Sequence, residues 1–283
     1  MAENEACSSA GSCSRESCEG CPGNSGGQTS FLEELNQYSS IGKVIGVISG
    51  KGGVGKSFVT ASLACAMHKA GYRVGILDAD ITGPSIPKML GVHGTAFGSE
   101  KGIIPLESNQ GIPVMSINLL IEDEEQPVIW RGPVIAGAVK QFWTDVVWGE
   151  LDYLFVDMPP GTGDVPLTVF QSLPVDGVVI VTSPQELVQM IVKKAYNMAA
   201  MMEVPVLGVV ENFSCLVCPD CGKTISIFGE SHVEAVAKEL KIPVFAKLPI
   251  EPEKAAAADA GTFYDVDHSV FSAAVETLQK PMP

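Results

Sequence analysis

The chain has 283 residues, and its 33 acidic against 18 basic side chains give a net charge of −15, which argues against non-specific binding to nucleic acid or to an anionic membrane. No apolar run approaches the roughly 18 residues of a membrane-spanning helix, and the N-terminus lacks the basic and apolar regions of a secretory signal. We therefore expect a cytoplasmic protein with one large α/β domain, whose eight cysteines stay reduced and indicate metal or redox chemistry more than disulfides, although Cys65, within the helix expected over 58–70, is expected to pack in the core.

The first segment, residues 1–40, is rich in Ser, Gly, Glu and Cys and has almost nothing to bury before Phe31. We expect it to be flexible on its own and separate from the domain formed by residues 41–283, with a short helix over 31–35 as a lead-in. Four thiolates in so short a stretch suit a [4Fe–4S] cluster or a zinc ion, although a flexible tail with incidental cysteines is the alternative. These cysteines are Cys7, Cys13, Cys18 and Cys21.

The strongest motif is Gly50–Ser57, Gly-Lys-Gly-Gly-Val-Gly-Lys-Ser, which fits the phosphate-binding pattern G-x-x-x-x-G-K-[ST]. It lies between an apolar strand at 44–48 and a helix expected over 58–70, so backbone N–H groups and a helix N-terminus would meet phosphate oxygens. Lys56 would reach the β- and γ-phosphates, and the Ser57 hydroxyl would hold Mg²⁺. The candidate nucleotide-binding residues of the loop are Gly50, Lys51, Gly52, Gly53, Val54, Gly55, Lys56 and Ser57.

Lys51 is a second lysine at the start of this loop, and in a tight phosphate cradle it points away from the phosphates held by its own loop. It is either a solvated surface charge or a contact to a nucleotide bound in a second subunit, as an arginine finger supplied in trans is. The form K-G-G-x-G-K resembles the deviant P-loop class of nitrogenase iron protein, cell-division and partition ATPases, and iron–sulfur carrier ATPases. That resemblance implies a lysine that works across a dimer.

The rest of the chain alternates between short apolar runs and helical stretches. Nearly continuous apolar character suits central strands of a parallel sheet that is covered on both faces, so we expect a doubly wound, mostly parallel α/β fold. Ligands in such folds bind at the carboxyl ends of the strands. The expected strands are 44–48, 73–77, 113–117, 153–156, 177–181, 206–210 and 244–247, and the later helices are 133–148, 185–202, 229–240 and 267–279.

Acidic residues follow two of these strands, as Asp78-Ala-Asp80 and as Asp157 at the start of Asp-Met-Pro-Pro-Gly-Thr-Gly-Asp. Carboxylates near the phosphates can position the attacking water or complete the Mg²⁺ shell. Asp80, further out on its loop, is the better candidate for the water, whereas Asp78 is equally explained by capping or turn formation. Asp157 ends an apolar strand, as the Mg²⁺-supporting acid of P-loop enzymes does.

A second cysteine group, Cys215-Leu-Val-Cys-Pro-Asp-Cys-Gly, follows the sixth strand. Cys218 and Cys221 have metal-ligand spacing, but two thiolates cannot complete a four-coordinate site. A second chain could supply the other two, giving a [4Fe–4S] cluster that bridges a dimer, or Cys18-Glu-Gly-Cys21 could complete a Cys₄ zinc site. Cys215 is a third ligand, a transfer thiol or a packing residue, and we favour the absence of direct ligation.

Several of these motifs together resemble the Mrp/NBP35 family, whose members are cytosolic ATPases that assemble and hand over iron–sulfur clusters. The likeness covers residues 40–265, and it implies a P-loop NTPase fold like those of nitrogenase iron protein and MinD. The segments that carry it are Gly50–Ser57, Leu77–Pro87, Arg131–Pro133, Trp148–Tyr153, Asp157–Asp164, Ser183–Gln185 and Glu211-Asn upstream of a Cys-Pro-x-Cys.

The resemblance also assigns roles to single residues. It implies that Lys56 and Ser57 bind phosphate and Mg²⁺, that Lys51 acts across the dimer, and that Asp80 orients water. Asp157 would support the metal and Asn212 would contact the adenine of ATP. The N-terminal cysteines resemble the cluster-binding extension of the NBP35 branch, although their spacing differs from the eukaryotic one.

The expected function is that of a homodimeric ATPase that binds a [4Fe–4S] cluster across the dimer and transfers it to apo-proteins, without nucleic-acid or membrane partners. One alternative is a spatial-regulator ATPase of the MinD/ParA type, which would need a basic or amphipathic attachment surface. A second is an ATP-gated electron donor like nitrogenase iron protein, which keeps its cluster. A third is a non-catalytic zinc-binding scaffold.

Overall fold

The fold is taken from a computed structural model that describes residues 32–80, 85–120, 132–185 and 188–281. Contacts divide the chain into a unit of residues 1–31 and a unit of residues 32–283, and all described residues belong to the second. The expectations for Cys7, Cys13, Cys18 and Cys21 therefore lie outside the described residues.

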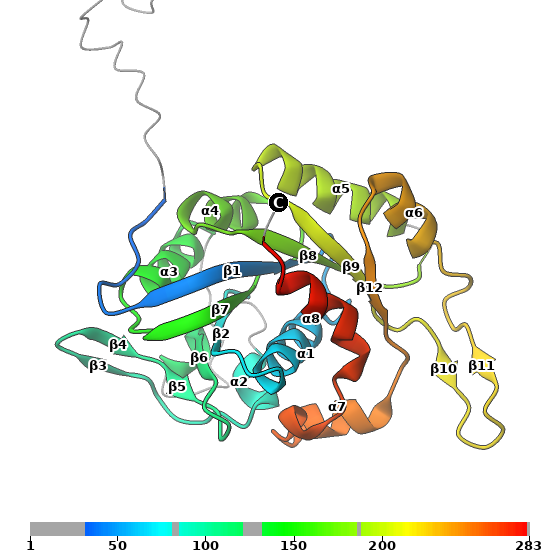
Figure 1. The fold of residues 1–283 in the computed structure, drawn as a ribbon, viewed down its shortest axis with the longest axis horizontal. Helices are drawn as coiled ribbons and strands as arrows, with labels where there is room; N and C mark the ends of the chain where they lie inside the picture. Colours follow the sequence, from blue (N-terminus) through cyan, green and yellow to red (C-terminus); the bar gives the residue numbers. More distant parts are fainter. Residues whose placement is uncertain (1–31, 81–84, 121–131, 186–187, 282–283) are drawn as a thin grey trace, which may run out of the picture. The chain divides into compact units, whose positions relative to one another are not determined.

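The second unit is built on an eight-stranded sheet with the order β12-β9-β8-β1-β7-β2-β6-β5, in which only the β5–β6 pair is antiparallel (Figure 1). All seven expected strands are present, and the doubly wound, mostly parallel fold is confirmed. The strands are β1 (Ser40–Ile48), β2 (Val74–Asp78), β5 (Leu106–Glu107), β6 (Pro113–Ser116), β7 (Glu150–Asp157), β8 (Gly177–Thr182), β9 (Val206–Glu211) and β12 (Val244–Lys247).

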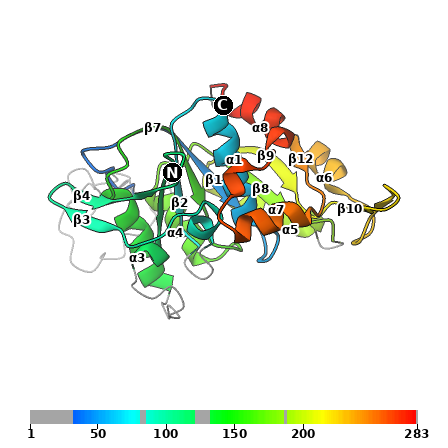
Figure 2. The ribbon, with the colours of Figure 1, turned by 90° about the horizontal axis from the view of Figure 1, so that it is seen from below.

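Helices cover both faces of this sheet, because the chain runs from β1 to β2 in one direction across the sheet and from β6 to β12 in the other, and right-handed crossovers in opposite directions place their helices on opposite faces. On one face α1 (Lys56–Lys69) packs against α8 (Ser272–Leu278) and α2 (Ile86–Met89), and α7 (Pro252–Asp259) packs against α2 (Figures 1 and 2). The other face carries α3 (Gly132–Thr144), α4 (Asp164–Ser172), α5 (Val188–Met201) and α6 (Val233–Leu240). None of the described helices has the length and apolar character needed to cross a lipid bilayer.

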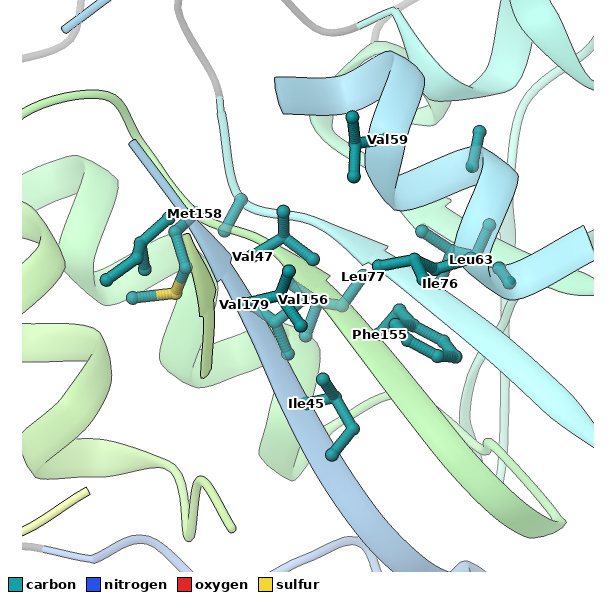
Figure 3. Packing of buried hydrophobic residues seen from close by; sticks show 14 of the residues in the cluster. Ile45, Val47, Val59, Leu63, Ile76, Leu77, Phe155, Val156, Met158 and Val179 are labelled. Atoms are coloured by element: carbon teal, nitrogen blue, oxygen red, sulfur yellow. The ribbon is translucent and has the colours of Figure 1, made fainter. Parts of the chain in front are cut away.

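The core explains why the strand segments read as apolar runs. Ile45 and Phe155 of neighbouring strands are fully buried, and Leu63 of α1 lies beside Ile76 of β2 (Figure 3). Since both faces of the central strands are covered, inward and outward positions alike take apolar residues. These rigid strands end where the candidate site residues begin, at Ile48, Asp78 and Asp157.

The chain before β1 and several short elements depart from expectation. The helix over 31–35 is wrong in its described part, because residues 32–35 are not helical: the Glu33 N–H donates to the Ser172 carbonyl (2.9 Å), and the Glu33 carbonyl accepts from Trp143 Nε1 (3.0 Å). Two hairpins, the edge strand β5, three helices and two 3₁₀ turns were not foreseen, whereas the 3₁₀ turn Ser269–Phe271 lies within the expected helix 267–279. The unforeseen elements are β3 (Phe97–Ser99) with β4 (Gly102–Ile104), β10 (Leu216–Val217) with β11 (Thr224–Ile225), β5, α2, α4, α7, Ile117–Leu119 and Phe263–Asp265.

Candidate functional site

The loop between β1 and α1 leaves backbone N–H groups available at a helix N-terminus. Gly53 (φ 76°) and Gly55 (φ 80°) adopt left-handed conformations that only glycine takes without strain. Gly55 directly precedes α1, and no side chain caps the first turn of this helix. A side chain at Gly55 would also collide with Asn212. Uncapped N–H groups and the helix dipole make this end of α1 suited to an anion such as phosphate.

Lys56 lies in a buried cluster that joins α1 to two strand ends. Its Nζ is 2.8 Å from Asp157 Oδ1 and 3.3 Å from Asp80 Oδ2, and only 5% of its side chain is exposed. Asp157 also accepts hydrogen bonds from the Ser57 hydroxyl and from Thr60 Oγ1 (2.8 Å). Sequence reasoning missed Thr60, although its position four residues after Lys56 places it on the same helix face.

The surroundings of this cluster shift the pKa values of Lys56 and of the neighbouring Asp78. Burial would lower the pKa of Lys56, but the carboxylates of Asp157 and Asp80 outweigh it and raise the pKa, so the ammonium stays charged. Burial, followed by the charge of Asp157, raises the pKa of Asp78 well above its usual range. The Asp78 carboxyl accepts the Asp80 N–H (3.2 Å) and the Ser116 hydroxyl (3.3 Å), which suits a structural role for Asp78.

The donor set around Asp157 fits Mg²⁺. The Ser57 hydroxyl and the Asp157 carboxylate lie side by side, and both offer hard oxygen ligands. Across the part of the chain that the structure describes, no group of three or more His, Cys, Asp or Glu side chains is arranged to hold a metal ion. A site of one hydroxyl and one carboxylate suits Mg²⁺, which usually takes its remaining ligands from water and from substrate phosphates.

Two adjoining clefts, each of about 320 Å³, share Gly55 and Phe58, and one of them opens over this cluster. The first is lined by the glycine-rich loop and by the charged or polar side chains of Lys56, Ser57 and Asp80. The second is more apolar and is lined by Asn212, Phe213, residues 249–252, Ala255, Ala258 and Asp259. Phosphates fit the first cleft and a nucleobase fits the second. Sequence reasoning missed residues 249–252, and their only signal was their position after the last strand.

Asn212 holds the glycine-rich loop from the side. It directly follows β9, where its N–H donates to the Thr182 carbonyl (2.8 Å), and only 4% of the residue is exposed. Its Nδ2 donates to the Val54 carbonyl (3.0 Å), and its Oδ1 accepts the Phe213 N–H (3.0 Å). The structure thus brings Asn212 to the second cleft, with its amide already bonded to the loop.

The Lys51 side chain contacts Gln185 and takes no part in the buried cluster around Lys56. Its ammonium donates to Oε1 of Gln185, which follows β8 at the protein surface. An exposed hydrogen bond of this kind contributes little to stability and is easily exchanged for another partner. The predicted action of Lys51 across a dimer stays a prediction.

Cys218 and Cys221 lie in the turn of the β10–β11 hairpin, which projects beyond the sheet (Figure 1). The Cys218 N–H donates to the Lys223 carbonyl (3.0 Å), and the Gly222 N–H donates to the Cys218 carbonyl (2.9 Å). Hydrogen bonds from the N–H groups of Cys221 and Asp220, and from the Cys221 thiol, lower the pKa of Cys218. Such a turn favours the thiolate, which is the form that binds metals.

The two other described cysteines have different surroundings. Cys215 is half-buried at the base of the hairpin, where its carbonyl accepts the Ile250 N–H (2.7 Å) and its Sγ lies 3.8 Å from the Ser214 hydroxyl. Cys65 is buried in α1, and burial raises the pKa of its thiol to about 12, which suits a packing role.

Comparisons with known proteins agree with this geometry. The family model described as ParA, NUBPL iron-transfer P-loop NTPase, matches residues 40–282. An iron-sulfur cluster carrier protein of Methanocaldococcus jannaschii is 50% identical, over 79% of this chain and 78% of that one. A protein of the same name from Clostridium perfringens is 43% identical, over 95% of this chain and 99% of that one. A solved nucleotide-binding protein of Archaeoglobus fulgidus, in complex with ADP and with cobalt found in it, is 44% identical with a TM-score of 0.72, over 80% of this chain and 89% of that one.

Proposed function

The chain belongs to the NUBPL iron-transfer P-loop NTPase family, and on this premise we propose that it is an ATP-dependent carrier that holds a [4Fe–4S] cluster between two copies of itself and delivers it to apo-proteins. The family match confirms the resemblance drawn from the motifs. We propose a cytoplasmic homodimer whose clients are apo iron–sulfur proteins. The net charge of −15 supports the expectation of no nucleic-acid or membrane partner.

The observation that carries the proposal is the pair of thiols in the hairpin turn. Cys221 is exposed, and the turn amides favour the thiolate of Cys218. A [4Fe–4S] cluster takes four cysteine ligands, so one hairpin supplies half of the set and a second copy related by a twofold axis supplies the rest. A cluster held at an exposed turn is accessible to a client, as a cargo must be. In this proposal Cys7, Cys13, Cys18 and Cys21 hold a second cluster or zinc.

The nucleotide side of the proposal uses the two clefts. Gly50–Ser57 would bind the phosphates of ATP, and Asn212 would lie beside the adenine in the second cleft. Ser57 and Asp157 would hold Mg²⁺, which neutralises charge on the phosphates. Asp80, which lines the first cleft 3.3 Å from Lys56 Nζ, would orient the attacking water.

The cluster proposal is tested by oxygen-free reconstitution with iron and sulfide. The wild type should bind about four iron and four sulfide per dimer at the hairpin site, with a [4Fe–4S] absorbance that is lost in the double variant Cys218→Ala/Cys221→Ala. Every protein compared should also be measured with Cys18→Ala/Cys21→Ala, so that metal bound by these N-terminal cysteines is not counted. Cys215→Ala is the matched control and should keep the cluster.

Retention of the cluster in the Cys218/Cys221 variant, zinc in place of iron, or a strictly monomeric protein with and without nucleotide would each overturn the bridging site. Transfer is measured by activation of an apo-ferredoxin. A cluster that stays bound and only donates electrons when ATP is present would instead indicate an electron donor of the nitrogenase iron protein kind.

The proposed role of Lys51 is tested with mixed dimers. Lys56→Ala should abolish ATP hydrolysis, because it removes the cation that faces the phosphates. Lys51→Ala should abolish hydrolysis only when both subunits carry it, and mixed dimers should keep about half of the activity, since one intact lysine still reaches one nucleotide. Full activity of the Lys51→Ala homodimer would remove the role across the dimer.

A further inference from the structure

The cysteine hairpin, defined here as residues 214–231, is bonded at its first end to the wall of the second cleft and at its second end to Glu211, the residue before Asn212 of that wall. At its first end Phe213 lines the cleft, and the next residue, Ser214, donates through its N–H (2.8 Å) and its hydroxyl (2.9 Å) to the Leu248 carbonyl. The Ile250 N–H donates to the Cys215 carbonyl (2.7 Å), and Ile250 also lines the cleft. The first end of the hairpin is therefore bonded directly to cleft-lining residues.

The second end is held by a buried carboxyl. Glu211 is fully buried at the end of β9, and its Oε2 accepts a hydrogen bond from the hydroxyl of Ser231 (2.8 Å). Within the described residues, neither Oε1 of Glu211 nor Oγ1 of the adjoining Thr182 has a hydrogen-bond partner. Glu211 is followed in the chain by Asn212, which holds the Val54 carbonyl of the glycine-rich loop. Consecutive residues thus contact the hairpin and the nucleotide loop.

Phe213 occupies a backbone conformation that an aromatic residue rarely adopts. Its φ is 58°, in the left-handed region that is unfavourable for a residue with a side chain. The Asn212 side chain compensates by accepting the Phe213 N–H (3.0 Å) while it donates to the glycine-rich loop. A bulky residue is held in this conformation at the junction between the cleft and the hairpin, and such positions cluster at switch regions.

We propose that Phe213 and the Glu211–Ser231 hydrogen bond are positioning contacts that transmit nucleotide occupancy of the cleft to the thiols of Cys218 and Cys221. A ligand shifts a conformational equilibrium only through contacts that differ between the two states. The Phe213 ring would supply such a contact, because it lines the cleft that the base would enter. That these thiols are cluster ligands rests on the proposed function, whereas the coupling itself is measured in protein without a cluster.

The test follows the alkylation rates of Cys218 and Cys221 by iodoacetamide in the full, reduced, cluster-free chain, read by peptide mass spectrometry. Saturating Mg·ATP should change the rate of at least one thiol about five-fold or more in the wild type, the lower end of typical couplings between sites. Ser231→Ala removes the hydroxyl that holds the second end, so the change should shrink below about two-fold while ATP affinity stays at the wild-type value.

Three further variants sharpen the test. Ser231→Thr keeps the hydroxyl and should restore the nucleotide-dependent change, and Ser226→Ala, at an exposed serine of the same hairpin, should leave it intact. Phe213→Gly adopts the left-handed conformation without cost and lacks the ring, so at saturating nucleotide it should lose the change. Thermal unfolding of each variant confirms that the fold is retained.

Two outcomes would overturn the coupling: alkylation rates in the wild type that do not respond to nucleotide, or a full response that persists in both Ser231→Ala and Phe213→Gly. Neither outcome touches the carrier proposal, which is decided by separate measurements: the metal content of the Cys218/Cys221 variant, the oligomeric state and the transfer of the cluster. The two failures are therefore distinguishable.

Discussion

The buried cluster around Lys56 and Asp157, called the nucleotide cluster from here on, and the cysteine hairpin are built in opposite ways. Lys56 and Asp157 are almost completely buried, and α1 and the end of β7 hold them by several hydrogen bonds before any ligand is present. The hairpin has strands of two residues, and its Val217 and Ile225 are 49% and 43% exposed. The first region is preorganised by the core of the domain, as electrostatic catalysis requires. The second is positioned by its two ends, and its turn carries two of the four thiols of the proposed cluster site.

The largest expected effect is at Asp157. Asp157→Ala should lower the free energy of unfolding by about 3–5 kcal/mol, because it leaves the buried Lys56 ammonium without its nearest counter-charge. ATP hydrolysis should fall about 100-fold or more, since the residue proposed to support Mg²⁺ is lost. Urea unfolding and phosphate release measure the two effects.

Asp152 is the matched control, because it lies on the same strand and pairs with Arg73 at the surface. Asp152→Ala should cost only about 0–1 kcal/mol. Equal losses in the two variants would contradict the view that the nucleotide cluster is part of the core.

A smaller effect concerns Glu211, at the junction of the two regions. Burial raises the pKa of Glu211 above its ordinary value of 4.5, so the folded state binds the proton more tightly than the unfolded state does. The stability that this proton contributes is complete below pH 4.5 and is lost as the pH rises through the folded pKa. Glu211→Gln does not titrate, and its stability relative to the wild type should increase over that rise in pH, measured by urea unfolding.

Glu234 serves as a control of opposite sign. The hydrogen bond and charge of Lys247, 2.6 Å away, lower the pKa of Glu234, so its contribution is present above the unfolded pKa and lost as the pH falls. Glu234→Gln should therefore lose stability relative to the wild type as the pH rises. If the stability of both variants relative to the wild type changed with pH in the same direction, burial would not be the cause of the raised pKa of Glu211.

The smallest effect is expected in the hairpin turn. In the metal-free protein, Cys218→Ala/Cys221→Ala should change the free energy of unfolding by less than about 0.5 kcal/mol, because neither thiol is buried in the core. Thermal unfolding of the metal-free protein measures this change, and Cys65→Ala, at a buried cysteine, gives the contrasting result of a larger loss. A loss above 2 kcal/mol, of order the cost of a core truncation, would show that the turn supports the domain.

Much of the fold could be predicted because its signals are local. The seven expected strands are apolar runs, and each takes its place in the sheet, while Gly50–Ser57 was recognised from glycine spacing between a strand and a helix. The helix over 31–35 failed because Glu33 bonds to α4 and Trp143 instead of to its own neighbours. The α4 and α7 helices were missed because each is short and has a proline in its first turn, so that the segment after the strand reads as a loop.

The sequence by itself determined the family, the phosphate loop and the candidate ligand pair, since each of these depends on residues close together in the chain. Tertiary structure alone decided that Thr60 joins Asp157, that residues 249–252 wall the second cleft, and that Ser231 meets Glu211. Thr60 and Asp157 are 97 positions apart, and residues 249–252 face Gly55 across still more of the chain, so no local pattern relates these segments. They meet because parallel strands bring their carboxyl ends to one edge of the sheet, where loops from the whole length of the chain converge.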